Sequence, residues 1–216
     1  MFKRAAMFTL ALLLIVSMPT WAQNQIKPVV YAGGGIDLLL SPDLLKDYWK
    51  MGYGFGGGVG IQVKPNLELI GRVSFNTFPF DADKFLDDMD APAGVSVDGL
   101  DFRSLEFGAD MKYIFMSDQA NMMFKPFVVA GLGFANIKAT DATITAEDED
   151  DIEEVHLPFG DASETDFSFN FGGGFDYMFA PKAGAWVDVR YTYIASEGDA
   201  ISYLPIRAGV KFLFGN

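Results

Sequence analysis

The sequence predicts an all-β fold, specifically an eight-stranded antiparallel up-and-down transmembrane β-barrel. Three observations lead to this prediction: long segments in which apolar and polar residues alternate, an even number of such segments, and connections that alternate between short and long along the chain. The composition agrees, since 21 Phe, 8 Tyr and 23 Gly suit aromatic-rich strands. Half of the 216 residues are hydrophobic, which excludes a disordered chain.

The alternation has a period of two residues. From residue 53 to residue 64, every second side chain is apolar or aromatic, and the intervening positions hold Gly, Gln or Lys. Residues 166–179 and 203–214 show the same pattern. These segments are longer than the five or six residues of an ordinary soluble strand, so they favour strands that cross a bilayer.

Eight segments of this kind are present. The predicted strands cover residues 28–40, 51–64, 67–78, 100–116, 122–138, 165–179, 185–195 and 201–214. Tight links at 65–66, 117–121 and 180–184 alternate with long links at 41–50, 79–99 and 139–164, and 196–200 is the fourth and shortest link on the long side. Short turns at one end and longer loops at the other are typical of outer-membrane barrels.

The facing of the strands follows from the size of the barrel. Eight strands enclose room only for side chains or one small ligand, so the Phe residues are too many for the interior and are predicted to face lipid. The polar parity then turns inward. The predicted lumen charge network comprises Glu68, Arg72, Glu106, Asp110, Lys112, Asp176, Asp188, Arg190, Arg207 and Lys211. A paired structural network is favoured over a conducting route, whereas the facing of the strands at 28–40 and 122–138 stays open.

The first segment predicts export. Residues 1–22 combine Lys3 and Arg4, an apolar run at 8–18 and small residues spaced for cleavage after Ala22, as in a secretory signal peptide. The apolar run is shorter than the roughly 20 residues that span a bilayer as a helix. The predicted domains are therefore a signal peptide at 1–22 and an outer-membrane β-barrel domain at 23–216.

Several motifs occur in an order that carries a resemblance. They are the Gly-rich segment 52–60 closed by Lys64-Pro65-Asn66-Leu67, the segment 125–133 with Lys125-Pro126-Phe127, and Gly172-Gly173-Gly174 with the turn Ala180-Pro181-Lys182. Over residues 28–216 the chain resembles small outer-membrane β-barrel proteins, the porin-family and OmpA-like eight-stranded barrel domains. The resemblance implies a monomer in the outer membrane of a Gram-negative-type bacterium, with membrane lipid and the barrel insertion machinery as partners. Many such barrels end on an aromatic residue, whereas here Gly215 and Asn216 follow Phe214.

Residues suited to catalysis are scarce. The chain has no Cys, and its one histidine, His156, falls in a long link, so a Ser-His-Asp triad in the barrel wall lacks a base. We therefore expect no enzyme activity, no cofactor and no metal site. Residues 139–166 hold 11 acids and no Lys or Arg. They predict a solvated, mobile loop, with weak divalent-cation binding as the alternative.

The net charge of the chain limits the classes of partner that it can bind. A net charge of −13 excludes a nucleic-acid partner, which needs a basic footprint. We expect a structural or surface-interaction role, with the acidic loops 79–99 and 139–164 presented to an extracellular partner. A narrow, cation-preferring porin for small solutes is the alternative. A soluble lipocalin-like binder would require the Phe faces to turn inward.

Overall fold

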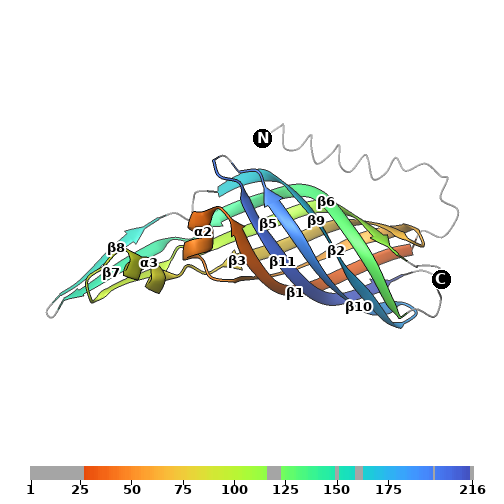
Figure 1. The fold of residues 1–216 in the computed structure, drawn as a ribbon, viewed down its shortest axis with the longest axis horizontal. Coiled ribbons are helices and arrows are strands. Elements are labelled where there is room, and N and C mark those ends of the chain that lie inside the picture. Colours follow the sequence, from red (N-terminus) through yellow and green to blue (C-terminus); the bar gives the residue numbers. More distant parts are fainter. Residues whose placement is uncertain (1–26, 116–122, 149–150, 159–162, 197, 215–216) are drawn as a thin grey trace.

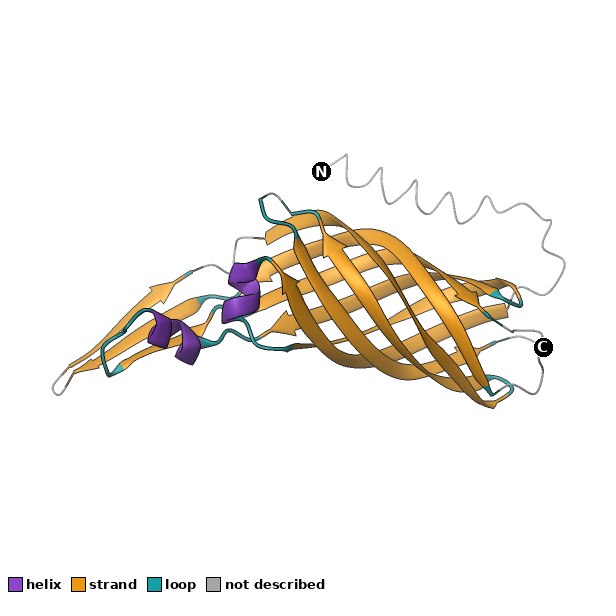
Figure 2. Ribbon diagram, in the orientation of Figure 1, coloured by secondary structure: helices purple, strands orange, loops and turns teal. Residues whose placement is uncertain are grey.

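Eight long strands close into one antiparallel barrel, and a smaller sheet extends from one of its ends (Figures 1 and 2). The computed structural model describes residues 27–115, 123–148, 151–158, 163–196 and 198–214. The barrel strands are β1 (Lys27–Ser41), β2 (Gly52–Lys64), β3 (Leu67–Phe78), β5 (Phe102–Ile114), β6 (Phe124–Ala139), β9 (Ser163–Ala180), β10 (Ala183–Ile194) and β11 (Ile201–Leu213). The proposed signal peptide lies outside the described residues and stays a prediction.

Barrel strands that follow one another along the chain pair with each other, and β1 pairs with β11 to close the barrel. The predicted fold class is thus confirmed, with strand bounds that differ by a few residues from those expected. The tight turns lie at one end, here the turn end, together with the start of β1 and the end of β11 (Figure 1). The long links lie at the other end, the loop end. The predicted turn at 117–121 lies outside the described residues.

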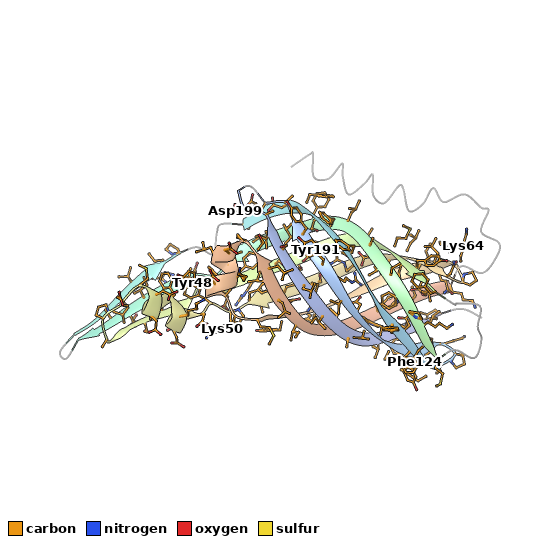
Figure 3. The ribbon with its side chains drawn as sticks, viewed as in Figure 1. Tyr48, Lys50, Lys64, Phe124, Tyr191 and Asp199 are labelled. Atoms are coloured by element: carbon orange, nitrogen blue, oxygen red, sulfur yellow. The ribbon has the colours of Figure 1, made fainter. Side chains whose placement is uncertain are left out.

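The apolar face of the strands points outward. Phe171 and Phe175 are about half exposed, whereas Glu68 and Asp110 on the opposite parity are buried. Aromatic side chains such as Phe124 and Tyr191 project from the wall in Figure 3. The lipocalin-like alternative, which needs the Phe faces to turn inward, is therefore wrong.

The structure also shows which side chains face inward on the two strands whose facing the sequence left open. In β1, the parity that holds Tyr31 and Asp37 turns inward. In β6, Phe127 and Val129 are buried inside the barrel. Inward positions on these strands that are occupied by glycine leave space for side chains that reach across the interior.

The long links are not simple loops, and the prediction of an unstructured acidic loop at 139–164 is wrong for the described part. Strands β4 (Val95–Gly99), β7 (Ala142–Asp148) and β8 (Asp151–Leu157) form a separate three-stranded sheet. Helices α2 (Asp43–Tyr48) and α3 (Ala82–Asp88) occupy the first two links. No helix in the described ranges is long and apolar enough to cross a membrane.

The small sheet forms because the β5–β6 ladder continues past the end of the barrel. Thr140 donates its backbone N–H to Asp101 across 2.9 Å, and β4 then pairs with β7 in regular antiparallel register. Three residues of β7, Thr143, Ile144 and Thr145, are β-branched and suit a strand. The acidic run begins after them, so its charge dominated the sequence pattern without preventing the pairing.

Because the outward face is predicted to contact lipid, a charge placed on it is expected to be costly. Val59 is 66% exposed at the middle of β2. Val59→Arg should destabilise the barrel in lipid vesicles by about 2–4 kcal/mol, whereas Met51→Arg, at the loop end, should cost about 0–1 kcal/mol. Denaturant unfolding followed by heat-modifiable gel mobility measures both, and equal costs would contradict the facing.

Candidate functional site

The interior of the barrel holds the candidate site, a network of charged side chains stacked in three layers. The ten residues predicted from the sequence all point into the barrel, and the structure brings each of them into at least one ion pair. An eleventh charged residue, Asp37, joins them. In Figure 3 the loop end is marked by Tyr48 and Lys50 and the turn end by Lys64 and Phe124.

The layer nearest the turn end pairs two lysines with two carboxylates. Lys112 Nζ lies 2.7 Å from Asp176 Oδ1 and 4.0 Å from Glu68 Oε2. Lys211 Nζ lies 3.1 Å from Glu68 Oε1 and 2.7 Å from Asp176 Oδ2. Tyr31 donates its hydroxyl to Glu68. The four charges cancel, so this layer is neutral.

The central layer is built around Asp110. This carboxylate accepts from Arg190 Nη1 at 2.6 Å and from Arg72 Nε at 3.3 Å. Arg190 also donates from Nε to Asp188 at 2.8 Å. A Cβ at Gly131 would lie 2.0 Å from Asp110 Oδ1, so this position of β6 must lack a side chain for the layer to form.

The layer nearest the loop end combines charged and neutral partners. Arg207 Nη2 lies 2.7 Å from Asp37 Oδ1 and 2.5 Å from Asn76 Oδ1. Glu106 accepts from the Tyr203 hydroxyl, and Arg72 Nη1 reaches it at 3.2 Å. Arg72 therefore links this layer to the central one.

Sequence reasoning missed Asp37. It follows Gly33-Gly34-Gly35-Ile36 and precedes three leucines, so its strand carried no clear polar parity. The available signal was the residue itself, because a carboxylate inside an otherwise apolar strand needs a buried partner.

Apolar clusters flank this network toward both ends of the barrel. At the loop end, buried side chains that include Phe78, Phe102, Ile194 and Tyr203 pack together, and Trp49 from the first link packs against them. At the turn end, Ile114, Phe127 and Val129 form a second cluster. The charged layers therefore lie between two apolar layers.

A cavity of about 80 Å³ remains beside the central layer. Glycines of β1 and β2 form one wall, and Arg72, Asp188 and Arg190 lie on its lining. This volume suits about two or three water molecules. Asp188 Oδ1 is buried without a protein hydrogen-bond partner in the described part of the chain, and water in the cavity would satisfy it.

The links at the loop end contact one another. The Trp49 indole donates to the Leu100 carbonyl across 2.8 Å, and its ring packs edge-on against Phe80. Lys84 Nζ donates to the Asp47 carbonyl at 2.8 Å, and Lys50 lies 3.3 Å from Asp81. The first two links and the sheet β4–β7–β8 are here called the platform.

His156 lies on the platform in an open arrangement. Its Nδ1 is 3.4 Å from Thr143 Oγ1, and its Nε2 is 3.8 Å from Asp141 Oδ2, with the His156 and Asp141 side chains both well exposed. Among the residues that the structure describes, no three His, Asp or Glu side chains are grouped so as to hold a metal ion. The acidic run between β7 and β8 includes positions that fall outside that description.

A family model for the outer membrane protein beta-barrel domain matches residues 8–214. The chain belongs to this family. It is an outer-membrane β-barrel of the Gram-negative envelope, in contact with membrane lipid, and the resemblance found in the sequence is confirmed. In barrels of this kind the longer loops ordinarily face the cell exterior and the short turns face the periplasm.

Solved structures share this fold. Neisserial surface protein A is similar with a TM-score of 0.51 and 17% identity, over 88% of this chain and 97% of that chain. A major outer membrane protein from Thermus thermophilus gives a TM-score of 0.51 and 11% identity, over 88% of this chain and 100% of that chain. The N-terminal β-barrel domain of Pseudomonas aeruginosa OprF gives 0.45 and 18%, over 89% and 100%. No curated protein sequence matches this chain.

Removing one carboxylate from the layer nearest the turn end should reveal the energetic cost of an unpaired buried charge. Asp176→Ala leaves Lys112 and Lys211 with Glu68 as their remaining carboxylate partner in that layer. We expect a loss of about 3–5 kcal/mol in the free energy of unfolding. Asp199→Ala, in an exposed loop, serves as the control and should change it little. A similar small effect at both positions would contradict a stabilising role for the layer.

Trp49 should hold the platform without supporting the barrel. Trp49→Ala removes the bond to Leu100 and the packing on the apolar layer. Limited proteolysis of the folded protein should then cut the links at the loop end faster, while heat-modifiable mobility stays that of a folded barrel. Wild-type cleavage rates in the variant would show that the links are held by other contacts.

Proposed function

We propose that this protein is a closed, non-catalytic outer-membrane barrel that presents an acidic platform to a partner outside the cell. The observation that supports the proposal is that apolar clusters flank the charged network toward both ends of the barrel, while the network itself is fully ion-paired among the described residues. A barrel built to pass solutes would need a continuous polar path. The elaborated part of this chain is instead the platform on the extracellular side.

The interior supports a structural role for the charge network. Among the described residues, nine ion pairs join its members within the barrel, and the cavity of about 80 Å³ lies beside the central layer. Buried charges of this kind are costly to separate, so an open route through them would require several pairs to break together. We infer that the network serves as the polar core of the barrel.

The platform supports an interaction role because it is both folded and strongly acidic. Residues 79–101 hold seven Asp and one Lys, and residues 140–162 hold nine Asp and Glu with no Lys or Arg. A charge excess of this size attracts cationic partners and repels acidic ones. Loops positioned by a rigid scaffold are a common location for binding residues.

The absence of catalysis is supported by the geometry around His156. The Thr143 hydroxyl, the His156 imidazole and the Asp141 carboxylate are neighbours, but their separations of 3.4 and 3.8 Å are longer than the roughly 2.6–3.2 Å expected for an activated nucleophile and its base. The three groups also lie on an open sheet surface, where water screens their charges.

A narrow cation-preferring porin is the second candidate, favoured by the acidic extracellular side and the polar interior. It predicts steady cation-selective openings of the full chain in planar bilayers. It also predicts that Arg72→Ala with Arg207→Ala raises the conductance, because both cations would then leave the path.

Planar-bilayer recordings distinguish the two functions. The closed barrel predicts no steady openings from the wild type or from the double variant, because the apolar layer at the loop end remains in both. Heat-modifiable mobility checks that each sample is folded, and Arg72→Gln with Arg207→Gln replaces the Ala pair where that pair does not fold. Steady wild-type openings would overturn the proposal.

A further inference from the structure

The small sheet of the platform has one apolar face and one polar face. Val97 of β4, Ile144 of β7 and Val155 of β8 are register partners, so they form a row across one face. Because side chains alternate along a strand, the same face also holds Val95, Ala142, Ala146 and Leu157. Among the positions whose side chains the structure describes, the opposite face holds Ser96, Asp98, Thr143, Thr145, Glu154 and His156.

The apolar face is covered on one side and open on the other. Val97 is 8% exposed, whereas Val155, two strands away in the same row, is 52% exposed. Helix α3 contacts β4 and lies along the sheet (Figure 2). Since Ser96 and Asp98 on the other face of β4 are exposed, α3 covers the face that holds Val97. The remaining part is here called the open half-face, and it is formed by Ile144, Ala146 and Val155.

The open half-face has the dimensions of one short helix. From Ala142 to Ala146, strand β7 rises roughly 14 Å, which is the length of a helix of about nine or ten residues. Neighbouring strands lie about 4.8 Å apart, so a helix about 10 Å wide spans β7 and β8 beside α3. Helix α3 already packs on this face in the same manner.

The borders of the open half-face are acidic. Helix α3 has three exposed Asp residues, and its one cation, Lys84, donates to the Asp47 carbonyl of α2 across 2.8 Å. Residues 147–154, in β7, β8 and their connection, hold seven acids and no Lys or Arg. An apolar strip with acidic borders is complementary to a helix that has one apolar face flanked by Lys or Arg.

We propose that the open half-face binds a cationic amphipathic helix of a polypeptide outside the cell. The apolar side of that helix covers Ile144 and Val155 beside α3, and its cations meet the acidic borders. Laying an amphipathic helix on an apolar surface is a common mode of peptide recognition. The inference rests on the proposed function, because it names the kind of partner that the platform binds.

The test uses the folded full chain in nanodiscs of zwitterionic lipid and a peptide of about 14 Leu and Lys residues, with Leu at helical spacing. Calorimetric titration measures binding, and the signal of empty nanodiscs is subtracted. The wild type is expected to bind this peptide about tenfold more tightly than a peptide of the same composition in which Leu and Lys alternate. Tighter binding of the alternating peptide would indicate strand pairing along the edge of β8 and would overturn the helix assignment.

Variants on the two faces of the same strands locate the site. Ile144→Thr with Val155→Thr keeps β-branched residues in both strands but removes apolar surface, so it should weaken binding of the helical peptide about tenfold. Thr145→Ser with His156→Gln changes the opposite face and should leave binding unchanged. Limited proteolysis of the links and heat-modifiable mobility check that both variants are folded. Equal affinity of the two variants for the peptide would overturn the site.

A charge variant leaves the apolar face intact and serves where the Thr pair does not fold. Asp87→Asn with Asp90→Asn removes two exposed negative charges from α3 and the residues after it, and Asn suits the positive φ of residue 90. This variant should bind the helical peptide roughly threefold to tenfold more weakly and with a smaller dependence on salt. Unchanged affinity and salt dependence would overturn the choice of a cationic partner.

Failure of this inference is distinguishable from failure of the proposed function. A wild type that does not bind the helical peptide overturns the inference, whereas silent planar bilayers would still support the closed barrel. Steady openings in bilayers overturn the closed barrel whether or not the peptide binds. Peptide binding that the face variants do not alter would overturn the open half-face as the site and would still support an acidic platform that attracts cations.

Discussion

An eight-stranded barrel has an interior just wide enough for side chains, and in this protein the charge network alone places six carboxylates and five cations there. Taking charges out of water is expensive, and the cost is recovered when each charge meets an opposite one at short range with its remaining hydrogen bonds satisfied. The rest of the structure depends on this constraint. It determines which strand positions face inward, and it leaves the outward positions free to be apolar.

The constraint also explains the glycines of β1, β2 and β6. Arg207 reaches Asp37 and Asn76 across a region where a Cβ at Gly54 would lie 2.6 Å from its guanidinium. Gly131 gives Asp110 the same freedom. One part of the wall is therefore thinned so that long cationic side chains from other strands can lie against it. The apolar clusters beside the pairs lower the local dielectric constant, which strengthens the pairs.

Much of this arrangement could be predicted from the sequence. The period of two indicated the strands, and the barrel size assigned Phe to the outside and ten charged residues to the inside. The pairing itself could not be predicted, because a partner such as Arg207 for Asp37 depends on cross-barrel distances. The facing of β1 was also hidden, since Gly and Leu occupy both of its parities.

The structure of the platform was predicted less well than the facing of β1. A run of acidic residues is ordinarily solvated and unpaired, and that expectation outweighed the β-branched residues of β7. The sequence does not show that β4 and β7 extend the ladder of β5 and β6. Because β5 and β6 are already paired in register, pairing β4 with β7 costs little additional chain entropy. The contact of Trp49 with Leu100 is likewise a product of tertiary structure, because 51 residues separate the two.

The central claim is that paired buried charges are the core of this barrel, and a double-mutant cycle on Asp37 and Arg207 tests it most directly. The free energy of unfolding would be measured in lipid vesicles for the wild type, Asp37→Asn, Arg207→Gln and the double variant. The account predicts a coupling energy of about 1.5 kcal/mol or more between the two residues. Additive effects, with no coupling beyond about 0.5 kcal/mol, would contradict it.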